Sequence, residues 1–416
     1  MRVAILCGAY YPSFSAVGLC ASRIAEELTA EHEVYVLSVT DRIETQTRFT
    51  YNGVNVYKAT PIWEKRKRQM QAAVKDHPGF SKAVTMAYQF RRMLSVVLGK
   101  YSVRKDFVSS FRQLLDSCPV PDVILACCMP VESLIAAYEY RRMRPKTIIS
   151  AMLYDGFSDA RTTHYFSWNR KLKLKRHIGL ERKLYMACKK VFFVHQNKQH
   201  LDTYHGQLKD KFVEVEHPNI LPIAKPKNVE PRLTTDTTDF VYGGGLKKGY
   251  IDPTDFITLI QELPGYKLHI YTSENGMQQF REYHQCQNVA FNGWLSQEDL
   301  LRVQYGAEFL INFATSDGHQ ISSKIFNYIS MGRPFIHIYN SPDDSNLRYL
   351  TEYPLCLCLD AADSKEANRE KLVIWCKKNL GRQIQFEQVS KIFKECTPEY
   401  ICGIIMEELT ENGSKE

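Results

Sequence analysis

Three consecutive polar residues, Ser322, Ser323 and Lys324, stand where a polar loop gives way to a periodic pattern at 321–331 that predicts a helix. Serine is a typical helix N-cap residue, and the first helical turn leaves backbone N–H groups without intrahelical partners. These N–H groups, the two hydroxyls and the Lys324 ammonium form a set that suits a diphosphate. Asn327 follows one turn later on a similar face. Serines at a helix start are usually only caps, so a purely structural role stays open.

A glycine-rich segment is a second candidate anion site. Residues 243–249 read Gly-Gly-Gly-Leu-Lys-Lys-Gly and follow a predicted strand at Phe240–Tyr242. The glycines, Gly245 among them, remove side chains from the end of the strand, and Lys247 and Lys248 can place ammonium groups over an anionic ligand. A flexible loop with solvated lysines is the competing interpretation.

The beginning of the chain carries a third glycine signal. A predicted strand at Val3–Cys7 is followed by a loop and then by a predicted helix at 16–30, which contains Gly18. A glycine at a helix N-terminus lets backbone N–H groups approach a phosphate closely, and the helix dipole favours an anion there. The segment lacks the spacing Gly-x-Gly-x-x-Gly, and a glycine before a helix is more often only a turn residue.

Short apolar runs alternate with helical patterns along the whole chain, which is typical of βαβ units on a parallel sheet. In the first half, strands are predicted at Val3–Cys7, Glu33–Val39, Val54–Lys58, Val123–Cys128, Thr147–Met152, Val191–Val194 and Phe212–Glu216, and helices at 16–30, 131–143, 164–188 and within 62–117. In the second half, strands are predicted at Phe240–Tyr242, Lys267–Tyr271, Val289–Phe291, Phe309–Phe313, Phe335–Ile338 and Leu355–Leu359, and helices at 253–263, 276–285, 296–306, 321–331 and 363–380. The predicted fold class is therefore α/β, with two doubly wound Rossmann-like domains.

A stretch rich in proline separates the two series of strands. The predicted organisation is an N-terminal domain at 1–220, a linker at 221–238, a C-terminal domain at 239–384 and a helical segment at 385–416. The last segment can pack back on either domain, the N-terminal one included. Ligands of open α/β sheets bind beyond the carboxyl ends of the strands. We therefore expect the ligand sites at these edges, facing each other across a cleft.

The net charge of +8 is unevenly distributed along the chain. Residues 1–220 hold 34 basic and 20 acidic side chains (+14), whereas residues 221–416 hold 20 and 26 (−6). Two windows, 62–112 and 161–190, each carry a net +9 with aromatic residues among the lysines and arginines. Such blocks are often only solvated helix faces, but two in one domain favour an anionic partner. An anionic membrane surface suits this composition, and nucleic acid ranks last because no nucleic-acid module is recognisable.

The twelve cysteines contain no Cys-x-x-Cys pair and are typical of small core residues. We therefore expect a reducing, cytoplasmic compartment. The first seven residues hold one basic residue and no leader pattern, and no apolar run approaches the roughly 18 residues that a membrane span requires. Contact with the inner face of the cell membrane is accordingly expected to be peripheral.

Four segments, taken in order, resemble glycosyltransferases of the GT-B fold, most closely the retaining family 4 enzymes of bacterial cell-surface polysaccharide synthesis. The opening RVAILCGAYYPSFSAVGLCASRIAEELTAEHEVYVLS is similar to that family's first strand, glycine loop, helix and second strand. DFVYGGGLKKG is similar to the start of its second domain, and NVAFNGWLSQEDLLRVQYGAEFLINF to its nucleotide-base segment. SSKIFNYISMGRPFI is similar to its Ser-Lys-x-x-Glu-Tyr-x-x-x-Gly-Lys-Pro helix. The resemblance covers nearly the whole chain.

The resemblance implies a donor site built from both halves. Gly18 would face the donor diphosphate, and Lys247 or Lys248, beside Gly245, would neutralise the leaving phosphate. The first turn of the helix at 321–331, with its two serines and its lysine, would cradle the phosphates.

The resemblance also assigns the nucleoside. The backbone near Trp294 and Leu295 would meet the nucleobase. Asn327 holds the position of the family's second glutamate, which binds the ribose, and an amide can still hydrogen-bond a diol. His319 holds the position of the first glutamate, with Asp317 two residues away as a possible substitute. The usual two-glutamate motif is therefore absent.

One acidic residue is a candidate for the sugar itself. The predicted strand TIISAML and the following Tyr-Asp-Gly-Phe resemble the family segment that delivers an acidic residue or a histidine beside the transferring sugar. Asp155 is that residue here. An aspartate that simply begins a turn before Gly156 is the structural alternative.

These features predict a glycosyltransferase that moves a sugar, with retention, from a UDP- or GDP-sugar to a hydroxyl of a polyprenyl-diphosphate-linked or saccharide acceptor in capsule, O-antigen or exopolysaccharide synthesis. No Asp-x-Asp motif is present, so lysine rather than Mg²⁺ is expected at the diphosphate, and no metal or other cofactor is expected. Two other classes stay open. They are a GT-B UDP-sugar epimerase and a non-catalytic homologue that binds a nucleotide sugar or glycan. His319 and Asn327, which stand at the two glutamate positions, favour the non-catalytic homologue.

Overall fold

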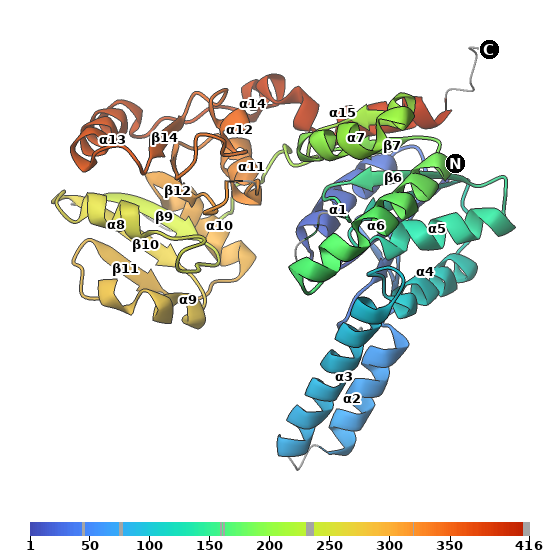
Figure 1. Ribbon diagram of the computed structural model, residues 1–416. Helices are drawn as coiled ribbons and strands as arrows, with labels where there is room; N and C mark the ends of the chain where they lie inside the picture. The colour runs from blue at the N-terminus through green and yellow to red at the C-terminus, as the bar shows by residue number, and fades with distance from the viewer. Residues whose placement is uncertain are drawn as a thin grey trace. The chain divides into compact units, whose positions relative to one another are not determined.

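The computed structural model describes residues 1–43, 46–74, 78–158, 160, 163–229, 237–318 and 320–410. The chain forms two compact units, one of Met1–Pro218 together with Pro398–Glu416 and the other of Asn219–Thr397. Each unit has its own sheet and its own core clusters (Figure 1).

The first unit is built on an eight-stranded sheet with the order β3-β4-β2-β1-β5-β6-β7-β8. Its strands are β1 (Arg2–Cys7), β2 (Glu33–Val39), β3 (Arg48–Tyr51), β4 (Val54–Ala59), β5 (Val123–Cys128), β6 (Ile148–Leu153), β7 (Val191–Phe193) and β8 (Phe212–Glu214). All neighbours are parallel except β3, which pairs antiparallel to β4. The central strands β1 and β5 are apolar and buried nearly throughout, as a parallel sheet covered on both faces requires.

Helices cover both faces of this sheet. The helices of this unit are α1 (Ala16–Leu28), α2 (Ile62–Ala73), α3 (Pro78–Leu98), α4 (Lys105–Ser117), α5 (Glu132–Met143), α6 (Ser167–Ala187), η1 (His195–Asn197), α7 (Lys198–His205), η2 (Gly206–Lys211) and α15 (Pro398–Thr410). Apolar residues of α4, α5 and α6 form a core cluster with one face of the sheet, and those of α1 and α15 form a second cluster with the other face.

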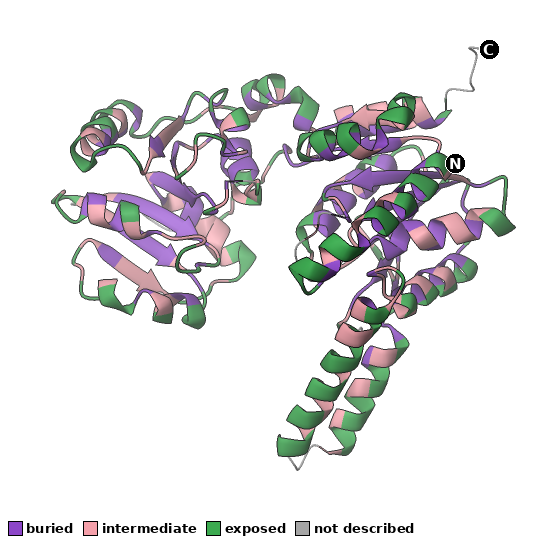
Figure 2. Ribbon diagram, in the orientation of Figure 1, coloured by how far each residue is buried: buried purple, intermediate pink, exposed green. Residues whose placement is uncertain are grey.

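Helices α2 and α3 lie side by side and project from the rest of the first unit (Figure 1). Most of their surface is exposed (Figure 2), including the large apolar side chains of Phe80, Met86 and Phe90. The predicted helical stretch within 62–117 is thus divided into α2, α3 and α4. Among the described residues, no helix is both long and apolar enough to cross a membrane.

Strand β3 is the one strand of the first sheet that was not predicted. It has four residues that alternate between exposed and half-buried, so no apolar run marks it. Asn52 and Gly53 form its turn to β4 with positive φ angles of 47° and 80°. Asn-Gly is the residue pair typical of a two-residue hairpin turn, so a local signal was present in the sequence.

The second unit contains a six-stranded, wholly parallel sheet with the order β11-β10-β9-β12-β13-β14. Its strands are β9 (Thr238–Gly243), β10 (Tyr266–Tyr271), β11 (Val289–Asn292), β12 (Phe309–Phe313), β13 (Phe335–Tyr339) and β14 (Cys356–Asp360). Its helices are α8 (Thr254–Ile260), α9 (Glu274–Gln279), η3 (Arg281–Tyr283), α10 (Gln297–Gly306), α11 (Ser323–Ser330), α12 (Leu347–Leu350), α13 (Lys365–Asn379), α14 (Phe386–Ile392) and η4 (Lys394–Cys396). Apolar residues of α8 and α13 pack on one face, and those of α10, α11 and α14 on the other.

The boundaries between the two units along the chain differ from the predicted boundaries. Ile220 is fully buried in the core of the second unit, and the Tyr305 hydroxyl donates to the Ile223 carbonyl over 2.9 Å. The first described residues of the predicted linker are therefore part of that unit. The predicted segment 385–416 is divided at Pro398, because α14 packs in the second unit whereas α15 packs on α1 in the first.

Candidate functional site

The six-stranded sheet changes direction between β9 and β12. From β9 the chain adds β10 and β11 on one side, and then returns to place β12 on the other side. The loops that follow β9 and β12 therefore leave the sheet edge in opposite directions, which creates the crevice where open α/β sheets bind ligands. The glycine-rich segment follows β9, and helix α11 follows β12. Two of the three predicted anion sites thus lie at one switch point.

The loops after β9 and β12 are in direct contact. The Ser316 N–H donates to the Tyr250 carbonyl over 2.8 Å, and the Tyr250 hydroxyl donates to Gln320 Oε1 over 3.0 Å. His319, which was predicted to contact the donor, lies outside the described residues. The contact fixes the position of the glycine-rich segment relative to the start of α11.

Lys324 extends from the first turn of α11 to the end of β9. Its Nζ lies 5.3 Å from the centroid of the Tyr242 ring. A Cβ on Gly244, whose φ is +149°, would lie 2.5 Å from Lys324 Cε and 2.9 Å from Nζ. Only a glycine therefore leaves room for this lysine in its present position.

Lys324 is a partly desolvated cation. The side chain is half-buried, and burial lowers the pKa of its ammonium group. Among the described residues, no carboxylate forms an ion pair with Nζ. A desolvated cation without a partner is unfavourable by itself and is stabilised when an anionic ligand binds.

The two serines before Lys324 differ in their contacts. The Ser322 hydroxyl donates to Asn312 Oδ1 over 2.8 Å, and its N–H donates to Asn346 Oδ1 over 2.8 Å. Ser323 and Asn327 are both exposed on α11. The hydroxyl of Ser322 is therefore directed into the protein, whereas Ser323 and Asn327 are accessible to a ligand.

A buried polar network lies behind Ser322 and was not predicted. Asn312 Nδ2 lies 2.9 Å from His337 Nδ1, and the Asn346 side-chain amide donates to Asp344 Oδ1 over 2.7 Å. Burial alone would raise the pKa of Asp344, but the interactions with His337 and Asn346 hold it below its usual range. Asn312, the polar residue inside the apolar strand FLINF, was the one sequence signal for this network. The network holds the start of α11 in place through Ser322.

The lysines of the glycine-rich segment are also unequal. Lys248 Nζ forms an ion pair with Glu282, which raises the pKa of Lys248, and the Lys248 N–H donates to Gln279 Oε1 over 3.1 Å. Lys247 is exposed, with Nζ 5.4 Å from the Tyr250 ring centroid and no carboxylate partner among the described residues. Gly245 is exposed and its carbonyl accepts from the Tyr242 hydroxyl over 2.8 Å. Lys247 is thus the lysine with its charge available.

The predicted nucleobase contacts follow the edge strand β11. Trp294 lies between β11 and α10 with 68% of its surface exposed. Leu295 packs partly against the core beneath α10 and α11. An exposed indole at the carboxyl end of a strand can stack on a flat ring.

In the first unit, the corresponding switch point lies between β1 and β5. Gly18 is buried in the first turn of α1, and its N–H donates to Ser15 Oγ over 3.0 Å. A Cβ at this position would lie 1.9 Å from the Ala9 carbonyl oxygen. Gly18 therefore has a clear structural reason to be glycine, and its N–H already has a partner.

Asp155 is exposed just beyond β6, in a setting where desolvation raises the pKa of its carboxyl group. The segment that carries it is anchored three residues later. The Ser158 N–H donates to Glu181 Oε1 and the Ser158 hydroxyl to Glu181 Oε2, each over 3.0 Å. Gly156 lies beside the Asn197 side chain, which donates to the Leu153 carbonyl.

Two cavities of the first unit share a pair of arginines. One of about 580 Å³ is lined at the end of β5 by Met129 and Pro130, and one of about 930 Å³ lies among α3, α4, α5 and α6. Arg92 and Arg104 line both cavities. Arg104 forms ion pairs with Asp41 over 2.7 Å and with Asp106 over 3.0 Å.

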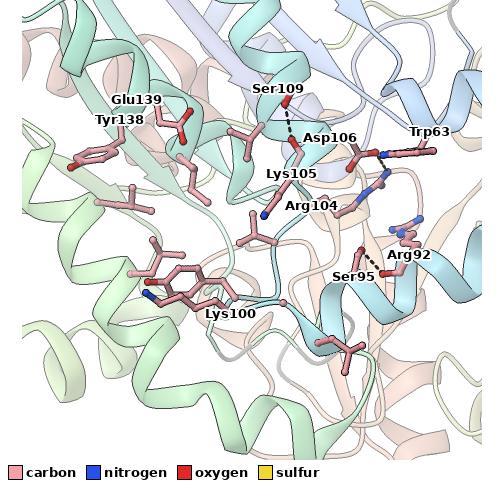
Figure 3. A pocket seen from close by; sticks show the side chains of 18 of the residues that line it. Trp63, Arg92, Ser95, Lys100, Arg104, Lys105, Asp106, Ser109, Tyr138 and Glu139 are labelled. Carbon is pink, nitrogen blue, oxygen red and sulfur yellow. Dashed lines mark hydrogen bonds and ion pairs between the residues drawn. The ribbon is translucent and has the colours of Figure 1, made fainter.

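The larger cavity combines positive charge with apolar walls (Figure 3). Arg91, Lys100, Lys105 and Lys183 line it, and none of these has a carboxylate partner among the described residues. Its apolar walls include Leu98, Val103, Ile135, Leu180 and Leu184. The cavity therefore suits a ligand with an anionic group and an apolar portion.

No model of a known protein family matches the sequence, and no curated protein matches it. Solved structures do match over nearly the whole length. An apo structure of OtsA has a TM-score of 0.61 at 11% identity and covers 99% of both chains. The apo form of the lipopolysaccharide outer core galactosyltransferase WaaB has a TM-score of 0.55 at 12% identity, with 98% of this chain and 99% of that chain covered.

A third match has a different chemistry. The UDP-GlcNAc 2-epimerase from Neisseria meningitidis, solved with UDP-GlcNAc bound, has a TM-score of 0.52 at 11% identity and covers 99% of this chain and 100% of that chain. At such identities the likeness concerns the fold alone. The predicted fold class is confirmed: this chain has the α/β fold of the GT-B glycosyltransferases, with two Rossmann-like domains.

Proposed function

We propose that this chain is a glycosyltransferase that binds a nucleoside-diphosphate sugar at the β9/β12 switch point. The observation that carries the proposal is Lys324, a half-buried cation that has no acidic partner in the described part of the chain and occupies the space above Gly244. The fold supports it, because WaaB is described as a galactosyltransferase and another structure of this fold, described as trehalose-6-phosphate from E. coli, was solved with UDP-2-fluoro glucose bound.

The proposed chemistry is separation of charge. As the diphosphate leaves, negative charge grows on its oxygens while the sugar becomes oxocarbenium-like, so fixed cations and helix N–H groups stabilise the transition state. Lys324, Lys247 and the N–H groups of the first turn of α11 take this role, without Mg²⁺ at the diphosphate. Reaction with retention, as in the family 4 enzymes, lets the leaving phosphate oxygen take the acceptor proton on the same face.

The remaining candidates are assigned to the ends of the donor and to the acceptor. Trp294 and Leu295 would meet the nucleobase, and Asn327 the ribose, with a neutral amide in place of a carboxylate. Asp155 would contact the sugar or the acceptor.

The acceptor is proposed to be amphipathic and anionic, a polyprenyl-diphosphate-linked saccharide of surface polysaccharide synthesis. The two cavities that share Arg92 and Arg104 support this, because the smaller adjoins the end of β5 and the larger joins cations to apolar walls. The exposed apolar and basic surface of α2 and α3 suits peripheral binding to the inner face of the cell membrane. Vesicle sedimentation tests this: the full chain should sediment with anionic vesicles and not with neutral ones, and equal sedimentation would contradict it.

A calorimetric screen against UDP, GDP, CMP and dTDP sugars tests the donor site. One base should bind, and Lys324→Met should weaken that binding by about 100-fold, in line with the loss of a buried charge-assisted contact. Lys378→Met, at an exposed position in the last turn of α13, is the matched control. Unchanged affinity in Lys324→Met would remove the basis of the proposal.

Epimerisation is the second candidate, because the Neisseria meningitidis epimerase shares the fold over the whole chain. The two reactions differ in their need for an acceptor. Conversion of a nucleotide sugar without any acceptor, followed by NMR, would identify an epimerase. Binding without turnover under either condition would identify a non-catalytic homologue, for which Asn327 at a glutamate position is the structural reason.

A further inference from the structure

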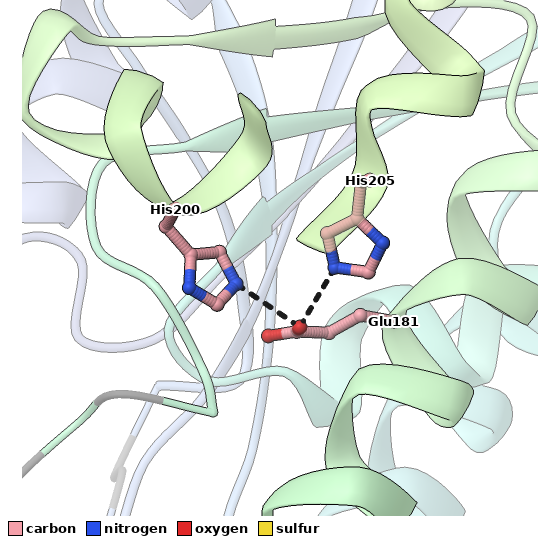
Figure 4. Close-up of side chains that lie close together, drawn as sticks. All are labelled: Glu181, His200 and His205. Carbon is pink, nitrogen blue, oxygen red and sulfur yellow. Dashed lines mark hydrogen bonds and ion pairs between the residues drawn. The ribbon is translucent and has the colours of Figure 1, made fainter. Parts of the chain in front are cut away.

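A buried cluster in the first unit lies outside the donor and acceptor sites proposed above. Glu181 of α6 faces His200 and His205 of α7 (Figure 4). The Nε2 atoms of the two histidines lie 3.2 Å and 3.1 Å from the same oxygen, Glu181 Oε2. The Ser158 hydroxyl lies 3.0 Å from that oxygen and 3.3 Å from His200 Nε2. Potential ligand atoms of three different segments thus lie close together.

Hydrogen bonding alone does not account well for this arrangement. A carboxylate oxygen has about two lone-pair sites, whereas three potential donors converge on Glu181 Oε2. Glu181 is 1% exposed, so its carboxylate is almost entirely removed from water. No lysine or arginine pairs with it among the described residues. A buried carboxylate in this setting favours a cation as its partner.

Four of the six separations among these atoms lie near those of tetrahedral coordination. Ligand atoms about 2.0–2.2 Å from a tetrahedral ion lie roughly 3.3–3.6 Å from one another. The separations of 3.0, 3.1, 3.2 and 3.3 Å lie at or slightly below this range, so the side chains would move apart by a few tenths of an ångström around an ion. All three potential metal-binding atoms of Glu181, His200 and His205 lie within 4.8 Å of one another.

We propose that Glu181, His200 and His205 bind one divalent transition-metal ion of the zinc type, with the Ser158 hydroxyl or a water as the fourth ligand. Two imidazoles and one carboxylate form a ligand set that such ions prefer over Mg²⁺ or Ca²⁺. His200 is 9% exposed, whereas Glu181 and His205 are 1% and 0% exposed, so His200 is on the side from which an ion enters.

The ion would hold protein segments in position and would not take part in the reaction, because none of its ligands is among the residues proposed to contact the sugar or the phosphates. It ties α6 and α7 to the segment after β6, in which Ser158 follows Asp155 by three residues. The site belongs to the first unit alone and is independent of metal at the donor diphosphate.

Metal titration of the intact chain tests the site. After treatment with a chelator and desalting, Zn²⁺ is titrated against a chromogenic chelator, and Co²⁺ binding is followed by visible absorption. One equivalent of Zn²⁺ should bind, and Co²⁺ should give the intense visible bands of a four-coordinate ion. Glu181→Gln and His205→Gln should each weaken Zn²⁺ binding by at least 10-fold.

His177→Gln is the matched control, since His177 is a buried histidine one turn before Glu181 on α6 and accepts from the Ser102 N–H instead. It should bind Zn²⁺ as the wild type does. Equal Zn²⁺ affinity of the wild type and Glu181→Gln would overturn the proposal. Should the variants fail to fold, the wild type alone decides: saturating Zn²⁺ must raise its Tm, and an unchanged Tm would overturn the site. These readouts require no activity, so they are separate from the test of the proposed function.

Discussion

Gly18 in the first unit and Gly244 in the second both lie beside the loop that follows the first strand of a parallel sheet, yet they make room for different groups. At Gly18 the nearest atom to a Cβ would be a backbone oxygen, that of Ala9, at 1.9 Å. At Gly244 it would be Cε of the Lys324 side chain, at 2.5 Å. The first glycine lets two backbone segments pack, whereas the second lets a cation reach the edge of the sheet. The second thereby accommodates a charge that has no acidic partner among the residues that the structure describes.

Gly18→Ala should have the largest effect on stability. The Ala9 carbonyl belongs to the backbone and cannot rotate away, so the overlap displaces α1 or its loop and lowers the free energy of unfolding by about 3 kcal/mol. Urea unfolding followed by circular dichroism measures this. Gly179→Ala, within α6 and with no neighbour within 4 Å of the added Cβ, should instead be neutral or slightly stabilising. Similar losses in both variants would remove the distinction between the two kinds of glycine.

Gly244→Ala should weaken ligand binding more than it lowers the stability of the fold. The lysine end is flexible and can swing away, so the cost to stability is about 1 kcal/mol, which reflects the φ of +149°. Displacement of the Lys324 ammonium should weaken binding of the nucleoside diphosphate by about 10-fold in calorimetry, since a misplaced cation loses its charge-assisted bond.

Gly249→Ala separates strain from displacement. Gly249 is in the same loop and has a positive φ of 71°, but no atom lies within 4 Å of the added Cβ. This variant should lose stability and keep its nucleotide affinity. If it loses as much affinity as Gly244→Ala, the effect of Gly244 comes from loop strain and not from Lys324.

Lys324→Met should stabilise the ligand-free chain while it impairs binding. Burial lowers the pKa of Lys324 in the folded state, so the unfolded chain holds the proton more tightly. At pH 7 this opposes folding, and removal of the charge should add about 1 kcal/mol to the free energy of unfolding. As pH rises from the folded pKa towards the unfolded value near 10.4, the wild type should regain this stability, and the difference from the variant should vanish. A difference independent of pH would show that packing and not charge is responsible.

The fold was accessible from the sequence where the signal is local. The runs that form β2, β5 and β12 are apolar and end at polar or turn residues, so their predicted and observed bounds coincide. Strand β3 has no such run, and the predicted helical segment after residue 385 is broken at Pro398, a residue that begins a new helix.

The site was accessible only in part. Each of Lys324, Ser322 and Gly244 belongs to a visible motif, but their mutual contacts depend on β12 lying next to β9, which is a matter of strand order. The same holds for Asn312 and Asn346, which come from different elements and both bond to Ser322. Similarly, no spacing along the chain indicates that Ser158, Glu181 and His205 converge, because the sheet and two helices bring them together.

Lys247 and Lys248 differ in whether their ammonium group has an acidic partner, and the expected effects are the smallest of those considered. They are adjacent and chemically identical, but the Lys248 ammonium pairs with Glu282 whereas Lys247 has no carboxylate partner among the described residues. Lys247→Ala should therefore weaken nucleoside-diphosphate binding about three-fold. The effect should be smaller in high salt, because salt screens the attraction between an exposed ammonium group and a phosphate. Lys248→Ala should change the affinity by less than about two-fold.

Glu282→Gln is the decisive addition, because it releases Lys248 from its ion pair without removing the lysine. If availability of charge is what distinguishes the two lysines, this variant should bind the nucleotide more tightly than the wild type, and the gain should disappear in the double variant with Lys248→Ala. A gain that persists in the double variant would mean that Glu282 repels the diphosphate directly. In that case Lys248 serves to neutralise a carboxylate at the edge of the site, and Lys247 and Lys324 are left as the cations that bind the ligand.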